Sequence, residues 1–146
     1  MNEIYLASDH GGTVLKANIA AHLSKSGYDV RDLGMKGTES VDYPDYAASL
    51  AEAMQKDVRA RGILFCGSGI GISIAANRFS HIRAALVTDV TAARLCRQHN
   101  DANMLSMGAR VLGEGLALEI VDAFLSASFE GGRHATRVDM ITAIEA

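Results

Sequence analysis

Short apolar runs alternate with longer stretches of helical periodicity along this sequence. The run at residues 3–8 and the run at residues 62–66 are almost continuously hydrophobic. Such runs are typical of strands in a parallel sheet that helices cover on both faces. The complete set of strands that the pattern predicts is 3–8, 28–33, 62–66, 82–88 and 103–108.

The longer stretches have the spacing of amphipathic helices. Leu15, Ile19 and Leu23 form one apolar stripe, and Gly27 is a natural stop for the helix that carries them. Pro44 suits the first position of a second helix. The predicted helices cover residues 13–27, 44–56, 90–99, 114–128 and 135–146.

This alternation predicts an α/β protein with a three-layer α/β/α, doubly wound (Rossmann-like) sheet of five parallel strands. No repeat, low-complexity tract or linker divides the chain, so we expect residues 1–146 to form a single domain. Ligands of such sheets bind at the carboxyl ends of the strands, near a topological switch point. The segments that this rule selects are 9–12 after the first strand, 66–71 after the third and 99–100 before the fifth.

Composition narrows the class of protein. The chain has 146 residues, 49% of them hydrophobic and 21% charged, with a net charge of −3. It lacks the basic excess of a nucleic-acid-binding protein, and its start, MNEIYLASDHGG, has neither the charge nor the apolar length of a signal peptide. No apolar run could span a bilayer. We therefore expect a soluble, cytoplasmic enzyme with neither nucleic acid nor membrane as a partner.

The segment CGSGIG, residues 66–71, fits none of three common motifs by its spacing. The dinucleotide fingerprint requires a glycine where the chain has Ile72, and a P-loop requires a Gly-Lys-Ser/Thr sequence that is absent. A cysteine phosphatase loop would end in an arginine, and after Cys66 no arginine occurs before Arg78. With these motifs excluded, the segment is a cysteine followed by a loop made mostly of small residues.

That loop can still bind an anion. Gly67, Gly69 and Gly71 allow a tight turn from strand to helix, so that backbone N–H groups and the helix dipole point into one pocket. The same dipole would favour the thiolate of Cys66 and make it a usable base. The alternative is that Cys66 is a small buried hydrophobe. Cys96, inside a predicted helix, is expected to serve packing.

Polar side chains at other predicted element ends are further candidates. Asp9 and His10 follow the first strand, where Asp9 could equally be a simple cap. His99 and Asn100 end a helix, where a histidine can merely be a partner of the helix dipole.

Three arginines are candidate phosphate ligands. Arg133 and Arg137 lie four residues apart and can face the same way on a helix, either to clamp a phosphate or as a solvated basic face. Arg110, after the fifth strand, is a weaker candidate.

Taken together, five motifs resemble the type B ribose-5-phosphate isomerase family, which includes allose- and galactose-6-phosphate isomerases. They are SDHGG, DYPDYA, CGSGIGISIAANR, RQHNDANMLSMGAR and EGGRHATRVDMI, which extend from Asp9 to the final helix. The resemblance implies a doubly wound fold, a homodimer or a tetramer, and no metal or other cofactor. The reaction it implies is the aldose–ketose interconversion of a phosphorylated sugar, ribose 5-phosphate and ribulose 5-phosphate, through a cis-enediolate.

The resemblance also implies residue roles. Cys66 would be the base that moves a proton between C2 and C1, and the loop's backbone N–H groups would hold the enediolate oxygen. His99 would protonate the ring oxygen, with Asp9 assisting at a hydroxyl, and the hydroxyl of Ser68 would contribute a hydrogen bond. The C-terminal helix would reach the partner subunit's site. The substrate-binding residues implied are Asp9, His10, Gly67, Ser68, Gly69, Ile70, Gly71, Asn100, Arg110, Arg133 and Arg137.

Two positions distinguish branches of that family. Cysteine-type members often have threonine where this chain has Ser68, and another branch carries a glutamate base where this chain has Ile72. The presence of Cys66 places the chain with the cysteine type. Two alternatives stay open: an isomerase of another phosphosugar, with four or six carbons, and a non-catalytic sugar-phosphate or nucleotide-binding module.

Overall fold

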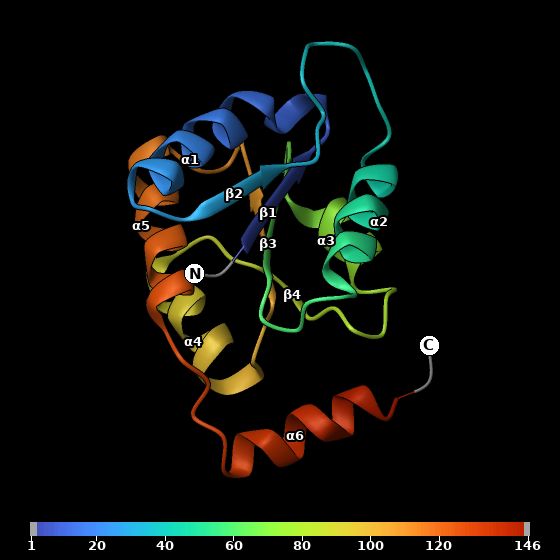
Figure 1. Cartoon of the computed structure of the whole chain (residues 1–146), viewed down its shortest axis with the longest axis vertical. Helices are drawn as coiled ribbons and strands as arrows, with labels where there is room; N and C mark the ends of the chain where they lie inside the picture. Colours follow the sequence, from blue (N-terminus) through green and yellow to red (C-terminus); the bar gives the residue numbers. More distant parts are fainter. Residues whose placement is uncertain (1–2, 145–146) are drawn as a thin grey trace.

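Five parallel strands form one sheet in the order β2-β1-β3-β5-β4 (Figure 1). The structure is a computed structural model and describes residues 3–144. The strands are β1 Glu3–Ser8, β2 Asp29–Asp32, β3 Arg61–Cys66, β4 Ala84–Leu86 and β5 Met104–Gly108. The predicted sheet of five parallel strands is therefore confirmed.

Helices cover both faces of this sheet. The helices are α1 Thr13–Lys25, α2 Tyr43–Met54, α3 Ile70–Ala76, α4 Val90–Asn100, α5 Glu114–Ser126 and α6 Arg133–Thr142, with a short 3-10 turn at His10–Gly12. Buried side chains of α1, α4 and α5 pack on one face, and those of α2 and α3 pack on the other. This arrangement confirms the three-layer α/β/α class.

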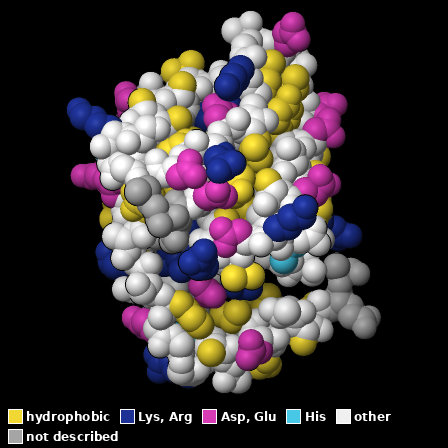
Figure 2. Space-filling view, viewed as in Figure 1, with side chains coloured by type: hydrophobic (Ala, Val, Ile, Leu, Met, Phe, Trp, Pro, Cys, Tyr) yellow, Lys and Arg dark blue, Asp and Glu magenta, His cyan; other side chains and the backbone are white. Residues whose placement is uncertain are grey.

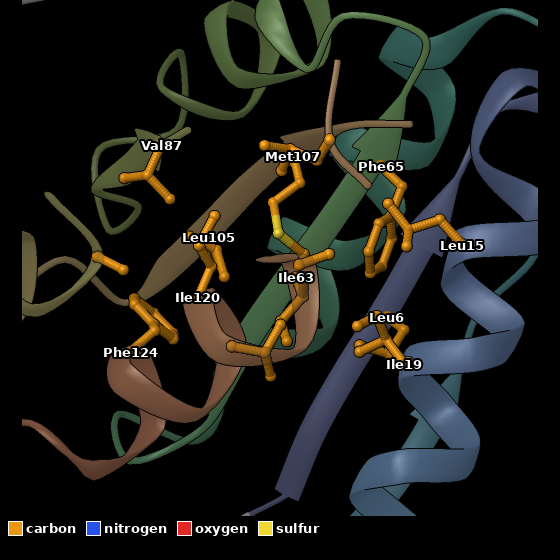
Figure 3. Packing of buried hydrophobic residues seen from close by; sticks show 14 of the residues in the cluster. Leu6, Leu15, Ile19, Ile63, Phe65, Val87, Leu105, Met107, Ile120 and Phe124 are labelled. Atoms are coloured by element: carbon orange, nitrogen blue, oxygen red, sulfur yellow. The ribbon is translucent and has the colours of Figure 1, made fainter. Parts of the chain in front are cut away.

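The larger core lies under α1, α4 and α5. Figure 3 shows Leu15 and Ile19 of α1 against Leu6 and Phe65 of the sheet, and Phe124 at the other end of the same layer. The stripe predicted on α1 is fully used, because Leu15, Ile19 and Leu23 are all buried. Burying an aliphatic side chain of this size contributes about 1.5–3 kcal/mol, so this layer fixes the frame that carries the site.

The edge strand β4 is shorter than predicted, three residues in place of 82–88. The side-chain amide of Asn77 forms hydrogen bonds of 2.8 and 2.9 Å with the backbone N–H and carbonyl of Ala84. These bonds occupy the outer edge of β4, where a further strand would otherwise pair.

The C-terminal helix also differs from its prediction. It was expected over residues 135–146, but α6 begins two residues earlier and ends at Thr142; residues 145 and 146 lie outside the described part. Within residues 3–144 no helix has the length and apolar character needed to cross a membrane.

Candidate active site

The carboxyl ends of β1 and β3 lie side by side, because Ser8 pairs with Phe65 in the parallel register. The chain leaves β1 toward α1 on one face and leaves β3 toward α3 on the other, which is a topological switch point. Asp9 and Cys66 are the first residues available at this point. The backbone N–H of Asp9 donates to the carbonyl of Phe65 over 3.2 Å and fixes the two segments together.

Cys66 is buried, and its Sγ accepts a hydrogen bond of 3.0 Å from the backbone N–H of Gly69. Gly69 has φ +78°, and a Cβ there would lie 2.7–2.9 Å from Leu86 Cδ1, Met107 C and Gly108 N. Both the dihedral angle and the close approach to β5 therefore require glycine. The Oγ of Ser106, buried in β5, donates to the carbonyl of Gly69 over 2.7 Å and holds the loop in place.

Ser68 forms a local hydrogen bond just before α3, whose N-cap residue is Gly69. Its Oγ accepts a hydrogen bond of 3.1 Å from the backbone N–H of Ile70. Two N–H groups of the loop, those of Gly69 and Ile70, are therefore engaged within the loop itself. Fewer backbone N–H groups are therefore left to bind a ligand than the glycine pattern predicted.

A cavity of about 590 Å³ opens above this loop. Two of its lining residues, Tyr43 and Val111, were missed by the sequence reasoning. The ring of Tyr43 covers the first turn of α3, because a Cβ on Gly71 would lie 2.6–2.7 Å from its Cζ, Cε1 and hydroxyl. The residues that line the cavity are Asp9, His10, Gly11, Tyr43, Cys66, Gly67, Ser68, Ile70, Gly71, Arg110 and Val111.

Asp9 has the capping role that its alternative interpretation predicted. Its Oδ1 accepts a hydrogen bond of 2.9 Å from the backbone N–H of Gly11 at the start of the 3-10 turn. The residue also lines the cavity beside Cys66. The two interpretations of Asp9 are therefore compatible.

His10 is oriented by the connection between β2 and α2. The backbone N–H of Val41 donates to Nδ1 of His10 over 3.2 Å, so the neutral ring carries its proton on Nε2. The start of this connection is anchored by Lys16, whose buried Nζ lies 2.6 Å from Asp32 Oδ1 and 2.7 Å from the carbonyl of Met35. His10, itself exposed, thus has an N–H donor left at Nε2 where it lines the cavity.

Arg110 is the cation of this cavity. Its backbone N–H donates to the carbonyl of Gly67 over 2.9 Å, and its side chain runs along the same residue. Among the described residues, no carboxylate oxygen lies within the 4.0 Å ion-pair distance of its guanidinium. An arginine beside a glycine loop and without a carboxylate partner suits an anionic group of a ligand.

His99 and Asn100 do not join this cavity within one chain. Their predicted grouping with the carboxyl ends of the strands is wrong, because a segment that precedes a parallel strand lies at its amino end. Cys66 pairs with Gly108, at the far end of β5 from Met104. At about 3.3 Å per residue the two ends of β5 are about 13 Å apart.

Arg133 and Arg137 lie with His99 and not with Cys66. They belong to α6, which packs on α4 at the amino edge of the sheet (Figure 1). The structure therefore divides the predicted site residues into two groups. The carboxyl-edge group is Asp9, His10, Cys66, the loop 67–71 and Arg110, and the amino-edge group is His99, Asn100, Arg133 and Arg137.

A histidine pair and a glutamate stand out in the amino-edge group. The rings of His99 and His134 stack with centroids 4.2 Å apart and planes 7° from parallel. Glu130 Oε1 lies 3.7 Å from Nε2 of His99 and 3.6 Å from Nε2 of His134. Burial, reinforced by the charges of His99 and Arg133, lowers the pKa of His134.

These three side chains could ligate a metal ion by residue type, since their ligand atoms lie within 4.8 Å of one another. The stacking argues against it. The lone pair of an imidazole lies in the ring plane, so an ion in the plane of one stacked ring lies well outside the plane of the other. As arranged, the two rings cannot both direct a lone pair at one ion.

A second cavity, also of about 590 Å³, lies between the C-terminal end of α6 and the residues around β4 and α4. Figure 2 shows hydrophobic side chains in this hollow above the C-terminal helix. Ile82, Cys96 and Ala102 line one side, and Ile141 and Ile144 line the other. Asn100 is at its border, so this hollow adjoins the amino-edge group.

A doubly wound fold with a buried thiol, a glycine loop and an arginine at its switch point defines a class: an α/β protein that binds a small anionic ligand. Known proteins identify it further. The sequence profile described as Ribose/Galactose Isomerase matches residues 4–141. The ribose-5-phosphate isomerase B of Escherichia coli K12 is 50% identical over 145 residues, covering 99% of this chain and 97% of that protein. The chain belongs to the ribose/galactose isomerase family.

Solved structures agree with this assignment. Ribose-5-phosphate isomerase B of Clostridium thermocellum superposes with a TM-score of 0.94 at 55% identity, covering 96% of this chain and 95% of that one. The Mycoplasma genitalium enzyme, solved with bound ribulose 5-phosphate, has a TM-score of 0.93 at 42% identity, covering 96% and 93%.

Proposed function

We propose that this chain is a ribose-5-phosphate isomerase that interconverts ribose 5-phosphate and ribulose 5-phosphate, with Cys66 as the base. The observation that carries the proposal is the position of the Cys66 thiol at the floor of a cavity that also holds Arg110. The relatives described above are named for this reaction, and one is solved with the ketose.

In the proposed reaction, the thiolate of Cys66 removes the C2 proton of the open-chain aldose. The electron pair moves toward C1, and the C1 oxygen becomes the enediolate oxygen. The backbone donors of the glycine loop stabilise that charge, apart from the N–H groups of Gly69 and Ile70, which already donate to Cys66 Sγ and Ser68 Oγ. The thiol then returns the proton to C1, while Asp9 assists the transfer of a hydroxyl proton between O2 and O1.

His10 and Arg110 are proposed to bind the substrate from the same chain. Nε2–H of His10 and the guanidinium of Arg110 are donors facing one cavity, and both suit phosphate or hydroxyl oxygens. Among the described residues that line the cavity of one chain, Arg110 is the single arginine and His99 is absent. The amino-edge group would supply both a ring-opening acid, His99, and further arginines, Arg133 and Arg137.

We infer that two copies of the chain complete each site in a cytoplasmic homodimer. His99, Asn100, Arg133 and Arg137 of one copy would then enter the cavity of the other. Two exposed apolar surfaces support this assembly. Ile70, which lines the cavity with Cys66, is 52% exposed, and Ile74, one turn further along α3, is 63% exposed. The apolar hollow beside α6 adjoins the amino-edge group. A symmetric dimer buries both kinds of surface.

The test is the value of kcat/KM over a panel of phosphorylated sugars. We expect ribose 5-phosphate to exceed erythrose 4-phosphate, allose 6-phosphate and galactose 6-phosphate by about 100-fold, because a misplacement of about 1 Å costs that much. A hundredfold preference for a four- or six-carbon sugar would show that the proposed substrate is wrong, while the proposed isomerase mechanism would stand. No isomerisation of any of these sugars would overturn the proposal.

A further inference from the structure

The segment between α5 and α6 returns to the end of α4 and places Glu130 beside His99. The backbone N–H of Glu130 donates to the carbonyl of Gln98 over 3.0 Å. Gly131 and Gly132 then turn the chain with φ of +67° and +57°, and a Cβ at either would meet only open space. Glycine is thus required here for its dihedral freedom alone, to start α6 at this point.

The turn sets His134 face to face with His99. The imidazole of His134 is buried, whereas that of His99 is partly exposed. A stacked ring at 4.2 Å restricts rotation of the His99 side chain, and Glu130 Oε1 lies 3.7 Å from Nε2 at the ring edge. His99 is therefore held from one face in a defined orientation.

From this geometry we propose that Glu130 and His134 are positioning residues, which hold His99 and its proton ready to open the sugar ring in the partner subunit's cavity. The inference rests on the proposed function. It gives a positioning role to Glu130 and His134, for which the family resemblance implied none.

The charged groups around His99 and His134 agree with a positioning role for Glu130 and His134. Glu130 lies 3.6–3.7 Å from both Nε2 atoms, at ion-pair distance, and so attracts a proton to the pair. Two imidazolium rings stacked face to face would repel each other. Burial, followed by the charges of His99, Arg133 and Arg137, lowers the pKa of His134, whereas Glu130 raises it. His134 therefore serves as the stacking partner, and Glu130 is the carboxylate beside Nε2 of His99.

The experiment separates ring opening from proton transfer at carbon. Ribulose 5-phosphate has no furanose form, because its C5 oxygen carries the phosphate, so the exchange of its C1 hydrogen with deuterium oxide needs Cys66 but no ring opening. Net conversion of ribose 5-phosphate, which is mostly cyclic, needs both. We would measure both rates in Glu130→Gln, His134→Ala and His134→Phe, with Glu119→Gln on the exposed side of α5 as the matched control.

Glu130→Gln and His134→Ala should each lower kcat/KM for ribose 5-phosphate by about 10-fold, a part of the 10²–10⁴ that positioned acid–base catalysis supplies. Their deuterium exchange should stay within about twofold of the wild type. His134→Phe retains a stacking ring and should recover most of the activity. If exchange in the wild type is too slow to follow, 4-deoxyribose 5-phosphate, an aldose that cannot close its ring, takes its place.

An equal loss in both assays would mean that the variants disturb the fold or the phosphate arginines, and would overturn the inference. So would unchanged conversion of ribose 5-phosphate in Glu130→Gln and His134→Ala. Failure of the proposed function is seen separately, since the wild type itself would then not convert ribose 5-phosphate.

Discussion

The backbone N–H of Gly69 donates to the Sγ of Cys66 across 3.0 Å, within one turn of chain. The sulfur is thus held as a hydrogen-bond acceptor at the end of a buried strand. Gly69 can serve because its left-handed φ turns the N–H back toward Cys66. This hydrogen bond joins the thiol to the glycine loop in space, whereas the sequence shows only that the two are adjacent.

Replacing Cys66 with alanine should remove isomerase activity and leave the fold intact. The change deletes one buried sulfur atom from the α2–α3 layer, and no other thiol or carboxylate of the loop can take the proton. Loss of a positioned base costs about 10²–10⁴ in rate. The assay is kcat for ribose 5-phosphate, with the circular dichroism spectrum as a check on folding.

Cys96→Ala is the matched control for that variant. Cys96 is also buried, but its sulfur donates to the carbonyl of Ala93 inside α4, away from the glycine loop. We expect wild-type kcat from it. Similar losses in the two variants would show that both thiols act through packing.

The two thiols should also differ in reactivity. Burial raises the pKa of Cys96 to about 11, so that almost no thiolate forms there at pH 8. Iodoacetamide at pH 8 should therefore modify Cys66, which lines the cavity, before Cys96, and activity should decline in step with the first modification. Peptide mass spectrometry assigns the site. Prior labelling of Cys96 would contradict the prediction, and ribose 5-phosphate should protect Cys66.

The stability of the protein should fall on acidification in part because of His134. Its pKa is lowered in the folded state, first by burial, from an ordinary value of 6.5. The unfolded chain then binds the proton more readily, so stability is complete above about pH 6.5 and is lost as the pH falls below it. His134→Phe removes this contribution. Between pH 7.5 and 5.5, the free energy of unfolding in urea should decline less in that variant than in the wild type; an equal decline would show that His134 titrates normally.

The carboxyl-edge half of the site could be predicted because it depends on chain order. Cys66 ends a buried strand, Asp9, His10 and Arg110 follow strands, and parallel strands bring their carboxyl ends to one edge. Tyr43 was missed because it is the first residue of α2 and follows no strand, and only its contact with Gly71 shows that it forms a wall of the cavity. The hydrogen bond from Gly69 to Cys66 depends on the φ angle of Gly69. A glycine in the sequence permits many values of φ, so the sequence does not predict this bond.

The amino-edge half could not be placed from the pattern of one chain. His99 was grouped with the strand ends by its closeness in sequence to β5, whereas α4 carries it back across the sheet. Its stacking on His134 depends on the return of residues 127–132, which have no periodicity to read. Both errors concern contacts between elements, and these are set by packing.

The division of the site into two edges gives a direct test of the composite dimer. Cys66→Ala and Arg137→Ala should each be nearly inactive alone, because one lacks the base and the other a phosphate ligand. In a mixed dimer, one cavity combines Cys66 from the second variant with Arg137 from the first, while the other cavity carries both defects. With random exchange at equal concentrations, half of the dimers are mixed and each has one intact site, so mixing should recover about a quarter of the wild-type activity. Native mass spectrometry of the mixture verifies subunit exchange, and a double variant mixed with wild type gives the baseline for dilution. Full exchange without recovery would place Cys66 and Arg137 in one chain's site and overturn the composite arrangement.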